Sequence, residues 1–212
     1  RFMGMEQPEL SMLSPTAKAE AWDGFYTTEE PKGEWWSVNY DASSWKKGQA
    51  AFGTMPEEAL ARTKWNTPDI WVRRIVTIND DISGKPVFLN YSHDDDAEIY
   101  VNGVKVVETG NKAFKDGMIE LPAEVSATLK PGDNVIAAHC HDRGGLAYLD
   151  FGLDIEKNNS RSLGNAAKQT SVTVDPMNTV YTFDCDDVEL TVTFTAPLFL
   201  ENLDLVSRPV NY

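Results

Sequence analysis

The sequence predicts an all-β fold in which short strands pack as a sandwich or jelly roll. Alternation of apolar and polar residues is the dominant pattern along the chain, as in strands with one buried face. Turn sequences such as KPGDN and DRGG separate the alternating runs, and helical periodicity is scarce. Many short strands divided by turns favour a two-layered β architecture over a helical one.

Two segments show the alternation most clearly. Segment 147–156 (AYLDFGLDIE) places its leucine, phenylalanine and isoleucine residues on one face. Segment 188–196 (VELTVTFTA) separates valine, leucine and phenylalanine from glutamate and threonine in the same way. Further strand candidates are 71–78 (WVRRIVTI), 85–92 (KPVFLNYS) and 134–141 (NVIAAHCH).

A β-hairpin is predicted at residues 97–108. Asn102-Gly103 between valines is the preferred sequence of a type I′ turn, because both central residues need a positive φ. A two-residue turn also fixes the pairing register of its strands. The expected pairs are Val101 with Val104 and Ile99 with Val106 on the apolar face, and Tyr100 with Lys105 on the other.

Composition and charge exclude several classes of partner. The 212 residues include 42% hydrophobic and 25% charged residues, as in an ordinary globular protein. With 33 acidic against 19 basic side chains, the net charge of −14 repels nucleic acid and anionic membrane surfaces. No apolar run approaches the ~18 residues that a membrane-spanning helix needs. We therefore expect neither nucleic acid nor a membrane as a partner.

An acidic cluster ahead of the hairpin is the first candidate site. His93 and the consecutive Asp94, Asp95 and Asp96 stand directly before the strand. Alternating side chains of an extended strand cannot all reach one ligand, so a shared site requires a loop. The cluster is interpreted as a solvated loop, with a structural calcium site and a ligand-binding edge as alternatives, although the EF-hand spacing is absent.

His139 and His141 are the second candidate site. Two residues apart in a predicted strand, they share one face and could bind zinc or copper if a third ligand such as His93 or Asp142 approaches. Three histidines in the whole chain, without a second paired motif, favour rim or core positions instead. The sequence therefore leaves the metal content open.

Sequence motifs of catalysis are absent. The chain lacks a G-x-S-x-G elbow, a P-loop, a G-x-G-x-x-G loop and an H-E-x-x-H helix. A carboxylate pair for glycoside hydrolysis could come from Asp94–Asp96, Asp142 and Asp150, but only the fold can supply its separation. No catalytic residue is predicted within this chain.

The six tryptophans all lie within the first 71 residues. Clustered large aromatic residues are typical of one wall of a small β core. Alternatively, Trp36 or Trp65 stays exposed and stacks against a sugar ring beside the acidic loop. The candidate ligand-binding residues are then Trp36, Trp65, His93, Asp94, Asp95, Asp96, His139, His141, Asp142 and Arg143.

Four segments together resemble a known family. VNYDASSWKKGQAAFGT, WNTPDIWVRRIVTI, HDDDAEIYVNGVKVV and NVIAAHCHDRGGLAYLDFGL are similar, in this order, to the galactose-binding-like jelly roll found as the sugar-binding domain of glycoside hydrolase family 2 enzymes. The resemblance covers roughly residues 20–157. It implies a galactose-binding-like jelly-roll β-sandwich that, in many such enzymes, braces the catalytic domain.

The flanking segments resemble a different family. Residues 169–212 are similar to the β domain of the glutaminase A-like family, and RFMGMEQPEL is similar to the end of that family's N-terminal region. This resemblance implies a parent amidohydrolase that converts glutamine to glutamate, with its catalytic domain downstream of Tyr212. It assigns no catalytic residue to this chain.

Together the two resemblances predict an inserted domain. Residues 1–13 are expected to end a preceding β region, 14–164 to form the jelly roll, and 165–212 to begin a truncated glutaminase A-like β domain. The chain ends would then form one partial second β unit, because inserted domains have neighbouring ends. The polar segment 157–169 (KNNSRSLGNAAKQ) is the expected exit linker.

The predicted function is that of a non-catalytic accessory module of a secreted glutaminase or other hydrolase. It would support or position substrate for a catalytic domain outside this chain, with neighbouring domains of the parent and carbohydrate as partners. The alternatives are a true carbohydrate-binding module of a glycoside hydrolase and an enzyme in its own right. The parent is expected in the periplasm or outside the cell, and no cofactor is expected apart from the calcium considered above.

Overall fold

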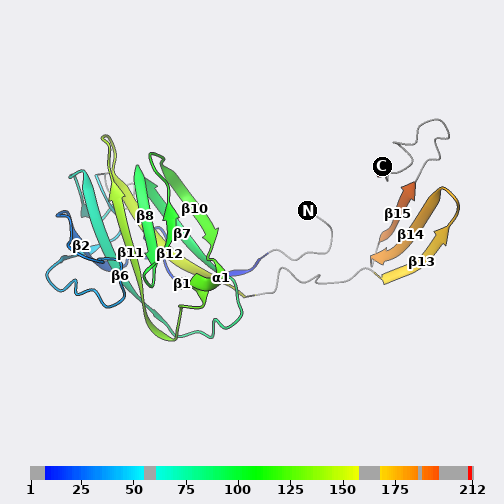
Figure 1. Ribbon diagram of the computed structural model, residues 1–212, viewed down its shortest axis with the longest axis horizontal. Helices are drawn as coiled ribbons and strands as arrows, with labels where there is room; N and C mark the ends of the chain where they lie inside the picture. Colours follow the sequence, from blue (N-terminus) through cyan, green and yellow to red (C-terminus); the bar gives the residue numbers. More distant parts are fainter. Residues whose placement is uncertain (1–7, 55–60, 158–167, 186–187, 196–209, 212) are drawn as a thin grey trace. The chain divides into compact units, whose positions relative to one another are not determined.

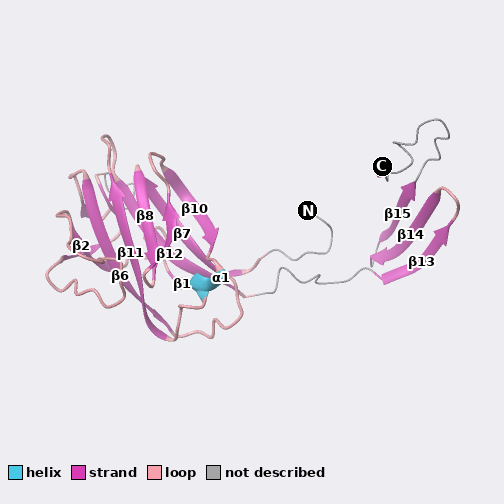
Figure 2. Ribbon diagram, viewed as in Figure 1, coloured by secondary structure: helices cyan, strands magenta, loops and turns pink. Residues whose placement is uncertain are grey.

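The computed structural model describes residues 8–54, 61–157, 168–185, 188–195 and 210–211. These residues form three sheets and one short helix, α1 (Ala123–Ser126), so the predicted all-β fold class is confirmed (Figure 2). In this part of the chain no helix is long and apolar enough to cross a membrane. The chain divides into two compact units, one of residues 8–159 and one that contains the strands from Lys168 onward.

Residues 8–159 form a β-sandwich of two sheets, whose strands can be followed in Figure 1. The first layer, sheet I, has the strand order β10-β7-β12-β4-β5, and β1 also pairs with β12. Its strands are β1 (Leu10–Ser14), β4 (Phe52–Gly53), β5 (Thr63–Lys64), β7 (Val87–Asp94), β10 (Phe114–Glu120) and β12 (Tyr148–Glu156). Neighbouring strands are antiparallel except β4 and β5.

Sheet II is the second layer and has the strand order β3-β2-β6-β11-β8-β9. Its strands are β2 (Asp23–Thr27), β3 (Lys46–Gln49), β6 (Asp69–Ile78), β8 (Asp96–Val101), β9 (Val104–Glu108) and β11 (Gly132–His141). β11 pairs with β6 along its whole length, and its second half also pairs with β8. These three strands therefore place side chains in rows across the sheet.

The second unit contains one sheet with the order β13-β14-β15-β16. Its strands are β13 (Lys168–Val174), β14 (Asn178–Cys185), β15 (Val188–Thr195) and β16 (Val210–Asn211). The alternation in segment 188–196 thus predicts a strand correctly for the residues that the structure describes. The predicted contribution of the N-terminal end to this unit falls partly on residues 1–7, which lie outside the described residues.

Strand pairing places the start of the sandwich earlier than the boundary predicted between residues 13 and 14. Leu10 to Ser14 form β1, and Leu10 pairs with Glu156 of β12. The described end of the predicted preceding β region is therefore part of sheet I, because its backbone hydrogen bonds are made there. The other predicted boundary, between residues 164 and 165, lies outside the described residues.

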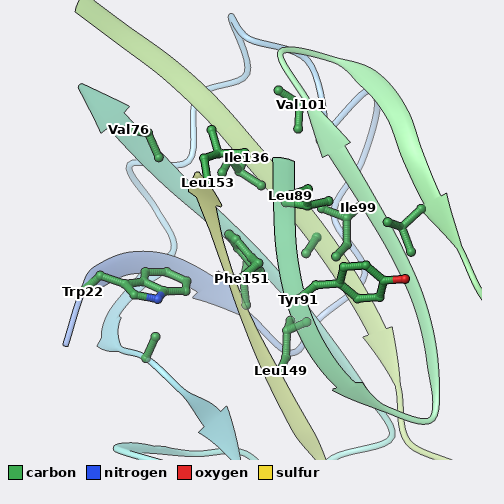
Figure 3. Close-up of a cluster of buried hydrophobic side chains, with 14 of the residues drawn as sticks. Trp22, Val76, Leu89, Tyr91, Ile99, Val101, Ile136, Leu149, Phe151 and Leu153 are labelled. Atoms are coloured by element: carbon green, nitrogen blue, oxygen red, sulfur yellow. The ribbon is translucent and has the colours of Figure 1, made fainter. Parts of the chain in front are cut away.

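The core lies between the two sheets and is built by the inward faces of their long strands. Leu149, Phe151 and Leu153 of β12 are fully buried, as the alternation in segment 147–156 predicts (Figure 3). Trp22 packs against Phe151 with ring centroids 4.9 Å apart. Complete burial of one such aliphatic or aromatic side chain stabilises a fold by about 1.5–3 kcal/mol.

The predicted hairpin is confirmed at its turn and corrected in its register. Asn102 and Gly103 have φ angles of 47° and 87°, as a type I′ turn requires. A β-bulge between the strands inserts one extra residue, which side-chain alternation does not reveal. The observed pairs are Val101 with Val104, Tyr100 with Lys105, and Ile99 with Val107 in place of the expected Val106.

The segment between β1 and β2 passes over β12 on its way from sheet I to sheet II. A Cβ atom added at Gly152 would lie 2.6 Å from the Ser14 carbonyl oxygen and 2.8 Å from the Thr16 nitrogen. Only glycine allows the two backbones to approach this closely. We call residues 15–22 the crossing segment.

Asp150 of β12 fixes the crossing segment in place. Its carboxylate oxygens accept hydrogen bonds from the Ala17 N–H at 3.0 and 2.8 Å, and Oδ1 also accepts from Trp22 Nε1 at 2.9 Å. The residue is 3% exposed, and burial raises the pKa of its carboxyl while these donors oppose the rise. A buried carboxylate is tolerable only with such partners.

Arg74 of β6 binds the same region from sheet II. Its Nη1 donates to the Pro15 carbonyl at 2.7 Å and to the Phe151 carbonyl at 2.9 Å. The guanidinium carbon lies 4.3 Å from the centre of the Trp22 ring, within the range of a cation–π contact. Burial lowers the pKa of Arg74 to about 10, so the side chain is a cation at neutral pH, and its charge favours ionised Asp150.

We predict that Asp150→Ala destabilises the chain by about 3–5 kcal/mol, because it leaves buried N–H donors and the Arg74 charge without their partner. Denaturant unfolding of the 212-residue chain measures the change. Asp80→Ala, at an exposed position, is the control and should shift the free energy of unfolding by less than about 0.5 kcal/mol. A loss below about 1 kcal/mol for Asp150→Ala would contradict this account.

Candidate functional site

A cavity of about 730 Å³ lies on the outer face of sheet I. Residues of β7 and β12 form its floor, because successive strand residues alternate between the core and this face. β7 contributes Asn90, Ser92 and Asp94, and β12 contributes Tyr148 and Asp154. The volume is within the range of small-molecule binding sites. We refer to it as the sheet I cavity.

Two segments form the walls of the sheet I cavity. One is the start of β10 with Phe114, which is 38% exposed, and the other is the crossing segment with Lys18. Lys18 Nζ and Asp116 Oδ2 join the walls in an ion pair of 3.0 Å, and the Asp116 N–H donates to Ser92 Oγ at 2.9 Å. The ion pair is largely exposed, so it positions the walls more than it stabilises the fold.

Some hydrogen-bonding groups of the floor already have partners within the protein, and others are available to a ligand. Asn90 Nδ2 donates to Asp154 Oδ2 at 2.8 Å, so this amide and carboxylate already have each other as partners. Burial raises the pKa of Tyr148 to about 12, and its hydroxyl is therefore protonated at neutral pH. Burial and the neighbouring Asp95 carboxyl raise the pKa of Asp94. Tyr148 and Asp94 are the floor groups best placed to bind a polar ligand.

His93 also lines the sheet I cavity, although it is only 2% exposed. Its ring lies nearly parallel to the Tyr91 ring, with centroids 5.8 Å apart, and 5.6 Å from the Phe114 ring. Nδ1 lies 2.8 Å from the Asp95 carbonyl oxygen, which can only accept, so Nδ1 carries the proton. Among the described residues Nε2 has no hydrogen-bond partner.

The three aspartates of the acidic cluster contact different groups. Asp94 lines the cavity, whereas Asp95 Oδ2 accepts from the Arg143 backbone N–H at 2.9 Å. Asp96 binds the Arg143 guanidinium through two hydrogen bonds of 2.6 and 3.2 Å, and this contact lowers the pKa of Asp96. Asp142 Oδ1 accepts from the Gly144 N–H at 2.9 Å within its own turn. The candidates 94–96 therefore do not converge on one ligand.

His139 and His141 meet on the outer face of sheet II, as their spacing predicts. His139 Nε2 and His141 Nδ1 each donate to Asp69 Oδ1 at 2.9 Å. The register of β11 and β6 thus brings Asp69 to the two histidines, in place of the expected His93 or Asp142. Burial raises the pKa of Asp69, but the two hydrogen bonds outweigh it and hold that pKa below its ordinary value.

The described residues contain no group of three His, Cys, Asp or Glu side chains placed to hold a metal ion. The shared Asp69 oxygen occupies one nitrogen of each histidine. This arrangement is a hydrogen-bonded cluster, and the Trp71 ring stacks on the His139 ring with centroids 4.6 Å apart.

The two candidate tryptophans have different environments. Trp65 is 1% exposed and packs in the main core, so the prediction that it is an exposed stacking surface is wrong. Trp36 is half-buried and stacks on Tyr100 with ring centroids 5.4 Å apart and an interplanar angle of 17°. With Trp35 and Trp71 it lines a second cavity of about 520 Å³ over sheet II.

Lys18, Phe114 and Tyr148 are among the cavity residues that the sequence analysis did not identify as site candidates. Tyr148 has a signal, because it occupies an outward position in the alternating segment 147–156. Phe114 follows the hairpin, and no pattern indicates that its strand returns to pair with β7. Lys18 reaches the site only because the crossing segment passes over β12.

Comparison with family models gives one match, to a domain of unknown function (DUF5127), over residues 177–212. This whole segment belongs to the second unit, outside the sandwich. The match names no activity, so the predicted relation to glutaminases stays a prediction. A comparison with curated protein sequences gives no match.

Comparison with solved structures gives glycoside hydrolase family 2 enzymes among the similar chains. A β-glucuronidase from Bacteroides uniformis is 16% identical with a TM-score of 0.48, over 84% of this chain and 22% of the enzyme. A family 2 member from Bacteroides cellulosilyticus is 15% identical with a TM-score of 0.47, over 82% and 24%. A β-glucuronidase from Ruminococcus gnavus is 11% identical with a TM-score of 0.48, over 90% and 35%. The chain thus spans only 22–35% of these three enzymes.

We predict that His93 makes the fold less stable in acid. Burial lowers the pKa of His93 below its ordinary value of 6.5 while the hydrogen bond to Asp95 opposes this, so the unfolded chain binds a proton before the folded chain does. The free energy of unfolding should fall as the pH drops from 6.5 towards the folded pKa, by up to about 1.4 kcal/mol per pH unit.

Urea unfolding at a series of pH values measures this dependence in the parent chain and in His93→Phe. The variant cannot bind the proton, so its stability should decline less over the same interval. The carboxylates titrate in both proteins, so their contribution to the pH dependence of the free energy of unfolding cancels when the two are compared. Equal acid dependence of the two proteins would contradict the assignment.

Proposed function

We propose that residues 8–159 are a non-catalytic carbohydrate-binding module that serves a larger hydrolase. The single observation that carries this proposal is the sheet I cavity, where aromatic rings and hydrogen-bonding groups share one concave surface. The motif resemblance to family 2 sugar-binding domains also favours it. This is the alternative function that the sequence left open, and the geometry supports it better than a purely bracing role.

The chemistry of the lining suits a sugar. A sugar ring has an apolar face that packs on aromatic side chains, and Phe114 and Tyr148 supply such surfaces on two different strands. Its hydroxyls need several donors and acceptors, and the Tyr148 hydroxyl, the Asp94 carboxyl and Ser92 lie on the same floor. Apolar surface with a few placed polar groups is the general design of small-molecule sites.

The partners of the lining aspartates argue against hydrolysis in this cavity. Asp150 accepts from Ala17 and Trp22, Asp154 accepts from Asn90, and Asp116 pairs with Lys18. Asp94 is then the remaining carboxyl of the lining. Glycoside hydrolysis generally requires two carboxyl groups that face each other across the bond, so binding without cleavage is the better assignment.

A second candidate function is support of a neighbouring catalytic domain. The observation that favours it is the DUF5127 match at residues 177–212, which begins soon after the last sandwich strand. In this proposal the parent is a secreted or periplasmic hydrolase of the glutaminase A-like type, and the sandwich contacts its other domains. Assay of the full-length gene product on glutamine and on a glycoside panel tests it, since activity on glycosides alone would count against a glutaminase.

We predict that the chain binds an oligosaccharide and that Tyr148→Ala and Phe114→Ala each weaken this binding at least about tenfold, or ~1.4 kcal/mol. Each change removes an aromatic surface of the cavity. A glycan array identifies the ligand, and calorimetry measures its affinity for each variant.

The matched control is Ile75→Ala, which truncates a 56% exposed apolar side chain on sheet II. It should bind as the parent does. Trp36→Ala distinguishes the second cavity: a loss confined to this variant would move the site to sheet II. A folded chain that binds no glycan would refute the proposed function.

A further inference from the structure

We propose that the sheet I cavity selects neutral or amino sugars over uronic acids, and that His93 Nε2 is a specificity contact that accepts a hydrogen bond from the ligand. This inference rests on the proposed function and names the class of sugar. Three features carry it: the tautomer of a buried histidine, the remaining carboxyl, and the balance of charge around the cavity.

The first feature is the buried nitrogen of His93. Nδ1–H is bound to the Asp95 carbonyl, so in the neutral ring Nε2 presents a lone pair and no proton. A buried polar atom without a partner costs free energy, and a ligand O–H or N–H that reaches it recovers that cost. The flanking Tyr91 and Phe114 rings line the same cavity as His93.

The second feature is the carboxyl of Asp94, the next residue along β7. It lines the cavity, and burial together with the carboxyls of Asp95 and Asp142 raises the pKa of Asp94. A ligand that offers a hydrogen-bond donor or a positive charge would therefore interact favourably with the Asp94 carboxyl. A ligand carboxylate would be a fourth acidic group at this point.

The third feature is the charge of the whole lining. Four aspartates and two lysines contribute to it: Asp94, Asp116, Asp150, Asp154, Lys18 and Lys115. Lys18 is already paired with Asp116, which leaves Lys115 as the lining cation without an ion pair among the described residues. With a net charge of −14 for the chain, the long-range field also repels anions. Donor-rich, uncharged or cationic sugars fit this environment, and uronates do not.

Calorimetry with the 212-residue chain and matched oligosaccharides of glucose, glucosamine and glucuronate tests the selection. The neutral or amino sugar should bind at least about tenfold more tightly than the uronate, because like charges penalise the wrong partner. Asp94→Asn should narrow that ratio by about fivefold, since one carboxylate is removed. Uronate binding equal to or tighter than the other two would overturn the inference while leaving the proposed function intact. Absence of binding by all three classes and by the glycan array would instead refute the proposed function.

His93→Phe tests the specificity contact, because phenylalanine keeps the ring stacking and removes Nε2. Affinity for the preferred sugar should fall about tenfold. His139→Phe is the matched control on sheet II and should stay within about twofold of the parent. Unchanged affinity of a folded His93→Phe would overturn the role of His93.

A measurement on the parent chain does not depend on the variant's folding. A ligand donor on Nε2 favours the neutral ring, so the pKa of His93 measured by nitrogen NMR should fall further on saturation with sugar. The titratable groups around the ring are Asp94, Asp95 and Asp96 beside it, Lys115 and Asp116 on β10, Tyr148 on β12, and Tyr91 on β7. An unchanged or raised pKa of His93 in the complex would contradict the contact.

Discussion

The sandwich depends on the way the crossing segment is held between its two sheets. Gly152 lets this segment pass over β12, Asp150 receives its N–H groups, and Arg74 reaches it from the other sheet. These contacts are buried, so each polar group needs the others to offset its loss of hydration. The same segment continues into Trp22, which packs on Phe151 in the core. One local constraint therefore joins sheet I, sheet II and the N-terminal strand.

The sheet I cavity follows from that constraint. The crossing segment forms one wall, and β10 forms the other because it pairs with β7 at the edge of the sheet. Residues that face away from the core then become the floor between two raised walls. A sheet face without these flanking segments would be an open surface with little concavity. The binding function proposed for this face is thus a consequence of how the sheet is flanked.

The outer face of sheet II has a different character. Rows of side chains across β6, β11 and β8 place Asp69 beside His141, and Trp71 beside His139. Aromatic residues from the loop between β2 and β3 cover the next part of this face. On this face Asp69 accepts hydrogen bonds from both histidines, and the Trp71 ring covers the His139 ring. These polar groups therefore already have partners within the protein. The two outer faces of one sandwich therefore differ in how many polar groups stay available for a ligand.

The sequence by itself determined the all-β class, the buried face of β12, the Asn102-Gly103 turn and the meeting of His139 with His141 on one face. These features depend on alternation and on local backbone preferences, which act over a few residues. Tertiary structure alone decided the burial of Trp65, the bulge that pairs Ile99 with Val107, and the partnership of Asp69 with both histidines. It also assembled the cavity from residues far apart in the chain, because strand order and the crossing of one segment over another are set by long-range packing that no local pattern records.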